Sequence, residues 1–118
     1  MNHYKMAFVG YIYAFTNKVN GKVYIGSTVD MKKRLKDHLY LPINPRVASD
    51  FKTFGKDKFE MTEIMHLTVF SKEELWLVED TYIAMNDTIH SGYNYKYNTF
   101  HVHKYDRQGE TLNNGSWQ

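Results

Sequence analysis

Two apolar stretches near the start of the chain have the pattern of paired β-strands. Val9 to Thr16 is a continuous run of apolar and aromatic residues, and Lys22 to Ser27 is a second, shorter run. Asn20-Gly21 stands between them and predicts a β-hairpin with a type I′ turn, because these residues tolerate positive φ angles. We therefore expect the two segments to pair as antiparallel strands.

A third strand is expected from Phe59 to Val69. Successive side chains of a strand point to opposite faces, so residues of one parity share a face. The odd-numbered residues in this segment are Phe59, Met61, Glu63, Met65 and Leu67. This pattern predicts a strand with one largely apolar face.

Two helices are expected between the hairpin and the third strand. Asp30 can cap a helix from Met31 to about Tyr40, and Asn44-Pro45 resembles the N-cap and first residue of another. In the first helix, Arg34 and His38 lie four residues apart, so we expect them to share a face.

The segment Ser71-Lys-Glu-Glu74 is a capping box and opens a further helix. We expect Glu79 to lie beside its core stripe, and Asp87 to Gly92 to form a turn. Thr99 to Tyr105 is a possible last strand. The residues expected in the core stripe are Leu75, Val78, Tyr82 and Met85. This order of elements predicts an α+β fold, a small mixed sheet with helices packed on it.

Length and composition bound the class of protein. The 118 residues suffice for one domain. The absence of cysteine excludes disulfides and cysteine-based zinc sites. No apolar run is long enough for a membrane span, and the N-terminal apolar stretch is too short for a signal peptide. We therefore expect a soluble, cytoplasmic domain with no membrane partner.

The net charge of +2 hides an uneven distribution. Residues 1–40 contain seven lysines and arginines and only two aspartates, whereas acidic residues prevail in residues 41–90. A basic N-terminal third is consistent with a surface for a polyanion, although a cluster of charges is more often a solvated helix face.

Five side chains have types suited to phosphodiester hydrolysis: Tyr13, Tyr24, Arg34, His38 and Glu79. That reaction needs a group that orients or deprotonates water and a cation that stabilises charge on the phosphate. A carboxylate can also hold a divalent metal there. Tyrosine is a poor base at its ordinary pKa of about 10 and would need a nearby cation. Taken singly, a residue of any of these types more often serves core packing or a solvated surface than catalysis.

The order of the motifs resembles a known family. Gly10-Tyr-Ile-Tyr13 followed by Val23-Tyr-Ile-Gly26 resembles the two-part signature of the GIY-YIG nucleases, most closely the small phage and intron-encoded homing-type members. The segments that continue the resemblance are Ser27-Thr28, Asp30 to His38, Phe51 to Phe59, Glu79 to Ile83 and Gly92-Tyr-Asn94.

The resemblance implies a central three-stranded antiparallel sheet flanked by helices and hydrolysis of DNA with one metal ion. It places the catalytic domain at residues 1–98 and leaves residues 99–118 as a C-terminal extension, either a hairpin or a truncated DNA-binding element. It also implies a phage or mobile-element origin, so that the cytoplasm would be that of a bacterial host.

The resemblance further implies a role for each matched position. Tyr13 would lie nearest the nucleophilic water, with Tyr24 as the second phenol. Arg34 would stabilise the scissile phosphate, and His38 would assist a tyrosine or the phosphate. Glu79 would be the protein ligand of Mg²⁺ or Mn²⁺.

The matched positions also include supporting residues. Gly26 would allow close approach of the backbone, and Asn94 would brace the site. Tyr11 departs from the family, which most often has glycine there; its side chain can be accommodated if it points outward. We expect four lysines to position DNA phosphates: Lys22, Lys32, Lys33 and Lys36.

Two features remain outside this scheme. His101 and His103 would share a strand face, but too few ligands lie nearby for a zinc site, so we interpret them as surface residues. For a nuclease the expected partner is DNA, with a homodimer or a partner protein as a possible source of specificity. The alternatives to a nuclease are a catalytically silent module that binds DNA or protein, and a structural or inhibitory protein.

Overall fold

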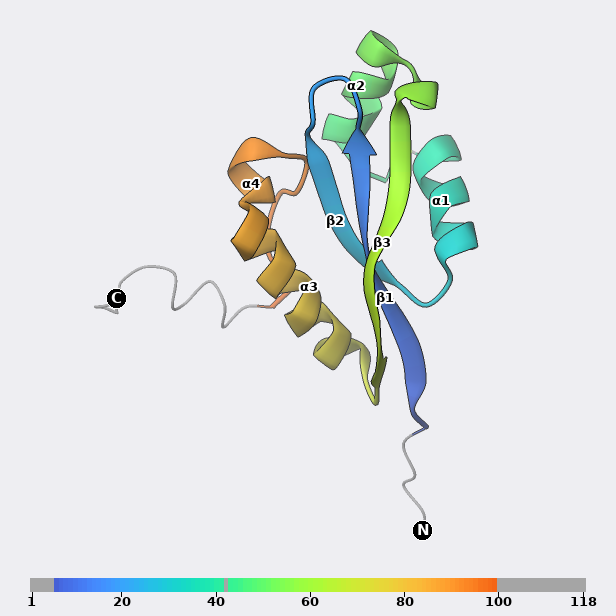
Figure 1. The fold of residues 1–118 in the computed structure, drawn as a ribbon, viewed down its shortest axis with the longest axis vertical. Coiled ribbons are helices and arrows are strands. Elements are labelled where there is room, and N and C mark those ends of the chain that lie inside the picture. Colours follow the sequence, from blue (N-terminus) through green and yellow to red (C-terminus); the bar gives the residue numbers. More distant parts are fainter. Residues whose placement is uncertain (1–5, 42, 100–118) are drawn as a thin grey trace, which may run out of the picture.

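The centre of the molecule is a three-stranded antiparallel sheet in the order β2-β1-β3 (Figure 1). The computed structural model describes residues 6–41 and 43–99. β1 (Phe8–Asn17) is the middle strand and pairs with both β2 (Val23–Thr28) and β3 (Phe59–Val69). The predicted α+β fold with a three-stranded antiparallel sheet is confirmed.

The helices begin at the predicted capping residues. The side chains of Asp30, Asn44 and Ser71 each accept a hydrogen bond from a backbone N–H in the first turn that follows. Each bond satisfies a donor that the helix itself cannot. Asp87 to Gly92, expected as a turn, contains a short helix, α4. The helices are α1 (Met31–Tyr40), α2 (Pro45–Phe54), α3 (Lys72–Asn86) and α4 (Thr88–Ser91), with a 3₁₀ turn at Lys56–Lys58.

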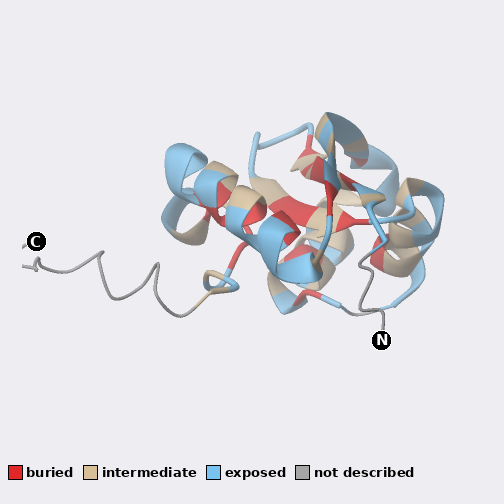
Figure 2. Ribbon diagram, turned by 90° about the horizontal axis from the view of Figure 1, so that it is seen from below, coloured by how far each residue is buried: buried red, intermediate tan, exposed pale blue. Residues whose placement is uncertain are grey.

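Helices cover both faces of the sheet, and each face has its own apolar core. On one face, Ile12 and Ile25 pack against Leu75 and Ile83 of α3. On the other, Phe15 packs with residues of α1 and α2 and with Phe59 and Tyr93, which complete that core. Figure 2 shows the buried residues concentrated in and against the sheet. The sheet is therefore the middle layer between two sets of helices.

The prediction of one apolar face on β3 was wrong. A register shift opposite Ile12 and Tyr13 leaves Ile64 as an extra residue, because Met65 pairs with Ile12 while Glu63 pairs with Tyr13. Such a bulge reverses the faces on which alternate residues lie. Phe59 and Met61 therefore pack on the α1 and α2 side, and Met65, Leu67 and Val69 pack on the α3 side.

The hairpin is confirmed, but its turn is not type I′. Asn17 and Lys22 close a loop of residues 18–21, in which Gly21 has a positive φ of 78° and Asn20 does not. The side chains of Asn17 and Asn20 accept hydrogen bonds from Val19 N and Lys22 N, at 2.9 Å each. These bonds satisfy backbone N–H groups in a loop of four residues, which is longer than the two-residue turn that was predicted.

The core stripe predicted for α3 was only partly right. Leu75 is buried, Val78 and Tyr82 lie at the margin of the core, and Met85 is 73% exposed. The buried residues of the helix are Leu75, Glu79, Asp80 and Ile83. The helix thus turns two carboxylates inward, and Glu79 lies within the buried face rather than beside it.

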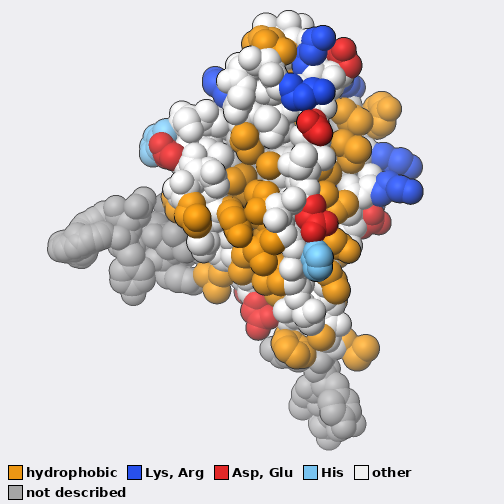
Figure 3. Space-filling view, viewed as in Figure 1, with side chains coloured by type: hydrophobic (Ala, Val, Ile, Leu, Met, Phe, Trp, Pro, Cys, Tyr) orange, Lys and Arg blue, Asp and Glu red, His pale blue; other side chains and the backbone are white. Residues whose placement is uncertain are grey.

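Figure 3 shows one outer face of the molecule, in the same view as Figure 1. Lysine and arginine side chains gather at the end that carries α2 and beside α1, and apolar side chains run down the middle of the face. Within the described residues, no helix is long and apolar enough to cross a membrane.

The bulge generates a prediction about deletions in β3. Removing Ile64 should leave every core residue of the strand on its present face and cost about 1 kcal/mol. Removing Glu60 from the same strand should move Phe59 to the opposite face and cost roughly 3–5 kcal/mol, as for loss of a buried phenylalanine. Urea unfolding of both variants measures the difference. Equal losses would show that the bulge does not set the faces.

Candidate active site

A hollow of about 310 Å³ lies beside the edge strand β2, where groups from both sides of the sheet meet. Arg34 reaches it from α1 and Glu79 from α3, and Tyr24 and Ser27 of β2 lie between them. The sequence did not indicate that Trp76, one turn before Glu79, and Lys72, two turns before it, also line the hollow. The complete lining is Tyr24, Ser27, Thr28, Val29, Arg34, Lys72, Leu75, Trp76, Glu79 and Asn98.

Tyr13 lies behind the hollow rather than in its wall. Tyr13 is paired with Gly26 on the neighbouring strand β2, and a Cβ atom at Gly26 would overlap the Tyr13 phenol. The tyrosine can occupy this position only because residue 26 has no side chain. Tyr13 is consequently 0% exposed, and its ring centroid lies 6.2 Å from that of Tyr24. Tyr24 is the phenol that reaches the cavity.

The Tyr13 hydroxyl is held by two residues of α1. His38 Nε2 lies 2.9 Å from Tyr13 Oη, and Arg34 Nη1 donates to the same oxygen at 3.4 Å. Phe15 stacks on the His38 ring with the centroids 4.5 Å apart. Within the described part of the chain, His38 Nδ1 is buried with no hydrogen-bond partner. The shared helix face predicted for Arg34 and His38 thus carries both contacts.

Burial sets the protonation of these groups at neutral pH. It raises the pKa of Tyr13 well above its ordinary value, with the nearby Tyr24 adding to the effect. Burial and the charge of Glu79 raise the pKa of Tyr24 to about 12. Burial and the Arg34 charge lower the pKa of His38 to about 4. Both tyrosines are therefore protonated at pH 7, and His38 is neutral.

Glu79 is a buried carboxylate that lacks a cationic partner. Its Oε1 accepts a hydrogen bond from Ser27 Oγ at 2.5 Å, and burial raises its pKa above the ordinary range. Among the ion pairs of residues 6–41 and 43–99, none includes Glu79. A carboxylate that borders an open hollow without a neutralising charge fits a hard divalent cation, which keeps several waters and binds through few carboxylates.

Arg34 borders the same hollow with part of its hydrogen-bonding capacity used. Its Nη1 donates to Ser27 O at 3.1 Å, and its Nε lies 3.8 Å from Asp37 Oδ2. Tyr13, Ser27 and Asp37 thus fix the guanidinium beside the cavity, and its charge is only loosely paired. A fixed guanidinium of this kind is suited to a phosphate.

Asn94 fastens the edge of β2 next to these residues. Its side chain accepts a bond from Ile25 N and donates to Ile25 O, both at 2.9 Å, as a neighbouring strand would. Thr88 Oγ1 donates to the same Asn94 oxygen at 2.7 Å. Ile25 lies between Tyr24 and Gly26, so Asn94 holds the backbone on which the site is built.

Asp80 is a further residue that the sequence analysis missed. Its buried carboxylate accepts four hydrogen bonds, from the backbone N–H and the side chain of both Asn98 and Thr99. Asn98 in turn lines the hollow beside Glu79, and its side chain favours the charged form of that carboxylate, which partly offsets the rise that burial causes in the pKa of Glu79. The signal that could have identified Asp80 is its position next to Glu79 in the same helix. The sequence analysis selected only Glu79 as a candidate.

The four lysines expected to bind DNA lie outside this hollow. Lys32, Lys33 and Lys36 are exposed on α1, and Lys33 pairs with Asp37 at 3.3 Å. Lys22 lines a different hollow, near α2 and α4. Their contact with DNA stays a prediction.

Two further expectations can be placed against the described residues. Tyr11 lies within β1 without interrupting it, its ring 6.0 Å from that of His66, so the departure from glycine is accommodated. His101, His103 and the possible strand that contains them lie outside the described residues. Within the described part, no group of three or more histidine, aspartate or glutamate side chains is placed to hold a metal.

Comparison with known proteins agrees with this geometry. The structure is similar to the catalytic domain of intron endonuclease I-TevI in two solved forms, each with a TM-score of 0.67. One form carries a substitution and is 26% identical, covering 79% of this chain and 99% of that domain. The other, described as the catalytic domain of homing endonuclease I-TevI, is 25% identical and covers 74% and 98%.

Two sequence comparisons complete the picture. Uncharacterized protein 019R of Invertebrate iridescent virus 6 is 35% identical over 80 residues, which is 64% of this chain and 28% of that protein. This chain therefore spans less than a third of the length of that relative. The model of the GIY-YIG catalytic domain matches residues 9–94, and the chain belongs to the GIY-YIG family.

Proposed function

We propose that this protein is a DNA endonuclease that hydrolyses phosphodiester bonds with one divalent ion, Mg²⁺ or Mn²⁺. The observation that carries the proposal is the meeting of Arg34 and Glu79 in one hollow at the β2 edge, although their helices lie on opposite faces of the sheet. A cation and an unneutralised carboxylate on either side of a cavity match the two charges that a metal-bound phosphate presents.

Glu79 is the residue that would hold the ion. When bound, a divalent ion would neutralise charge on the phosphate and polarise the leaving oxygen. Ser27 orients the Glu79 carboxylate through the hydrogen bond described above, and Asn98 lies beside it in the lining of the hollow. Arg34 faces the hollow from the opposite side, where it would bind the scissile phosphate and stabilise the negative charge that develops in the transition state.

The two tyrosines and His38 supply a route for the proton of the attacking water. Tyr24 lines the hollow and can contact water or phosphate. Tyr13, buried behind Tyr24, would receive the proton by way of that phenol, and it must release its own proton when it takes one. Neutral His38, with Nε2 2.9 Å from Tyr13 Oη, can accept that proton. Arg34 at 3.4 Å favours the phenolate form of Tyr13 during the transfer.

The wider setting is also proposed. Similarity to a viral protein and to an intron endonuclease supports a virus or mobile element as the source. We also propose that the DNA substrate is cytoplasmic. Cutting both strands requires two active sites or two successive nicks, which a homodimer or a partner protein would provide.

Nicking of supercoiled plasmid tests this function. With Mg²⁺ or Mn²⁺, the wild-type protein should nick DNA, and EDTA should abolish the reaction. Glu79→Gln and Arg34→Ala should each lower the rate by roughly 100-fold or more, as for loss of an electrostatic contact in the transition state. Glu73→Ala on α3 and Lys52→Ala on α2 are exposed controls that should retain activity. Circular dichroism verifies that the variants fold.

Two results would contradict the proposal: an absence of nicking under every divalent ion, or nicking that Glu79→Gln and Arg34→Ala leave unchanged. DNA binding that Glu79→Gln does not affect, together with no turnover, would instead favour a silent binding module.

The buried His38 predicts how stability depends on pH. The unfolded chain takes up a proton on His38 near its ordinary pKa of 6.5, and the folded protein does so only near 4. Stability is therefore full above about pH 6.5 and falls as the pH is lowered toward 4. Relative to His38→Phe, the wild-type protein should lose roughly 2–3 kcal/mol between about pH 7.5 and about pH 4.5.

Urea unfolding at a series of pH values measures this difference. His90→Phe replaces an exposed histidine and should retain the wild-type dependence. Parallel losses in the wild-type protein and His38→Phe would show that His38 is not kept neutral by the fold.

A further inference from the structure

Three hollows that share lining residues lie along the β2 edge. The hollow at Glu79 shares Tyr24, Glu79 and Asn98 with a second hollow of about 180 Å³. The second shares Tyr95 with a third, of about 440 Å³, that lies between α2 and α4. We call this series of hollows, from Trp76 at one end to Lys22 at the other, the edge groove.

Basic side chains from separate parts of the chain line the whole length of the edge groove. Lys72 and Arg34 border the first hollow, and Lys96 borders the second. Arg46 and Lys22 border the third. Asp50, in the third hollow, accepts a bond from the Tyr93 hydroxyl at 2.7 Å. The spacing of cations along a groove that ends at a phosphate-cleaving site is suited to the backbone of a nucleic acid strand.

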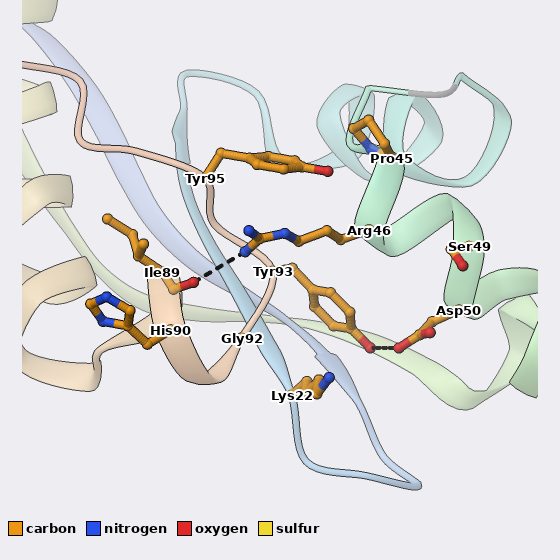
Figure 4. Close-up of a pocket in the computed structure, with 10 residues that line it drawn as sticks. All are labelled: Lys22, Pro45, Arg46, Ser49, Asp50, Ile89, His90, Gly92, Tyr93 and Tyr95. Atoms are coloured by element: carbon orange, nitrogen blue, oxygen red, sulfur yellow. Dashed lines mark hydrogen bonds between the residues drawn. The ribbon is translucent and has the colours of Figure 1, made fainter.

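Arg46 and Tyr95 form a rigid pair where the second and third hollows meet. Arg46 Nη1 donates to two backbone carbonyls, Ile89 O at 3.1 Å and Asn94 O at 2.7 Å. The guanidinium carbon lies 4.1 Å from the centroid of the Tyr95 ring. Figure 4 shows the guanidinium beneath the Tyr95 ring within the third hollow. Tyr95 is nevertheless 49% exposed.

This arrangement leaves one surface of the Tyr95 ring available for a ligand. The carbonyl bonds fix the guanidinium, and the guanidinium supports one ring face, so the tyrosine is held in place without being buried. An arginine already bonded to two carbonyls has less of its capacity left for a phosphate. The pair is therefore better suited to stacking a flat ring than to binding an anion.

Resting on the proposed nuclease function, we propose that the edge groove binds a single DNA strand and that Tyr95 stacks an unpaired nucleobase of the strand being cut. A base inside a duplex has both faces covered by its neighbours, and only an unpaired base can stack on a protein ring. The substrates that this favours are DNAs with unpaired nucleotides beside the cut, such as gaps and flaps.

Binding in EDTA, which prevents cleavage, tests the inference on the full chain. The probes are fluorescein-labelled oligothymidylate of roughly ten nucleotides, within the site sizes of single-strand grooves, an abasic strand of equal length, and a fully paired duplex without a loop. Tyr95→Ala should weaken oligothymidylate binding by roughly 5- to 100-fold and leave binding of the abasic strand unchanged. Tyr95→Phe keeps the ring and should bind as the wild type does.

Tyr40→Ala is the matched control. Tyr40 is also exposed, at 74%, and has Lys56 Nζ 5.2 Å from its ring centroid, but it lies in a separate hollow between α1 and α2. Its removal should not affect binding of any probe.

Three outcomes would overturn the inference: equal loss of oligothymidylate and abasic binding in Tyr95→Ala, no loss of either, or duplex binding that depends on Tyr95 as strongly as single-strand binding does. If plasmid is nicked in Mg²⁺ while Tyr95→Ala changes nothing, the inference fails and the nuclease function stands. An absence of nicking by the wild-type protein contradicts the function itself, whatever the oligonucleotides show.

Discussion

An antiparallel sheet separates the side chains on its two faces, and only at an edge can groups from both faces share one cavity. The site depends on this constraint, because Arg34 and Glu79 belong to helices on opposite faces and meet beside β2. An edge strand normally has unpaired backbone groups. Here Asn94 bonds to both backbone groups of Ile25, and Tyr93 N donates to Val23 O. The edge is thus closed by short polar contacts that leave room for the cavity.

Much of the fold could be predicted from local signals. Capping by Asp30, Asn44 and Ser71 depends on a side chain and a backbone N–H three residues away, so a short segment of sequence contains both partners. The faces of β3 could not be predicted in this way. The odd and even pattern around Ile64 is the same with or without a bulge, and only pairing with β1 decides where the extra residue lies.

The residues of the site could be predicted from an ordered motif, but their exposure could not. An ordered motif identifies Tyr13, Tyr24, Arg34 and Glu79 as candidates, but it says nothing about exposure. That Tyr13 is hidden while Tyr24 reaches the cavity follows from packing against Gly26. Asp80 and Arg46 were missed because their partners are distant in sequence: backbone carbonyls for Arg46, and the backbone and side chains of Asn98 and Thr99 for Asp80. In a pattern of polar and apolar positions, such residues are interpreted as surface charges. The buried face of α3, which contains Glu79 and Asp80, was therefore assigned to the wrong residues.

The clasp between Asp80 and residues 98–99 fixes that segment relative to the site. Asn98 and Thr99 are held by four hydrogen bonds to the residue that follows Glu79. A module attached to residue 99 would be tethered from a point that this clasp sets, and its local concentration around the cavity would depend on the length and stiffness of the connection. A change that loosened the clasp would lengthen such a tether.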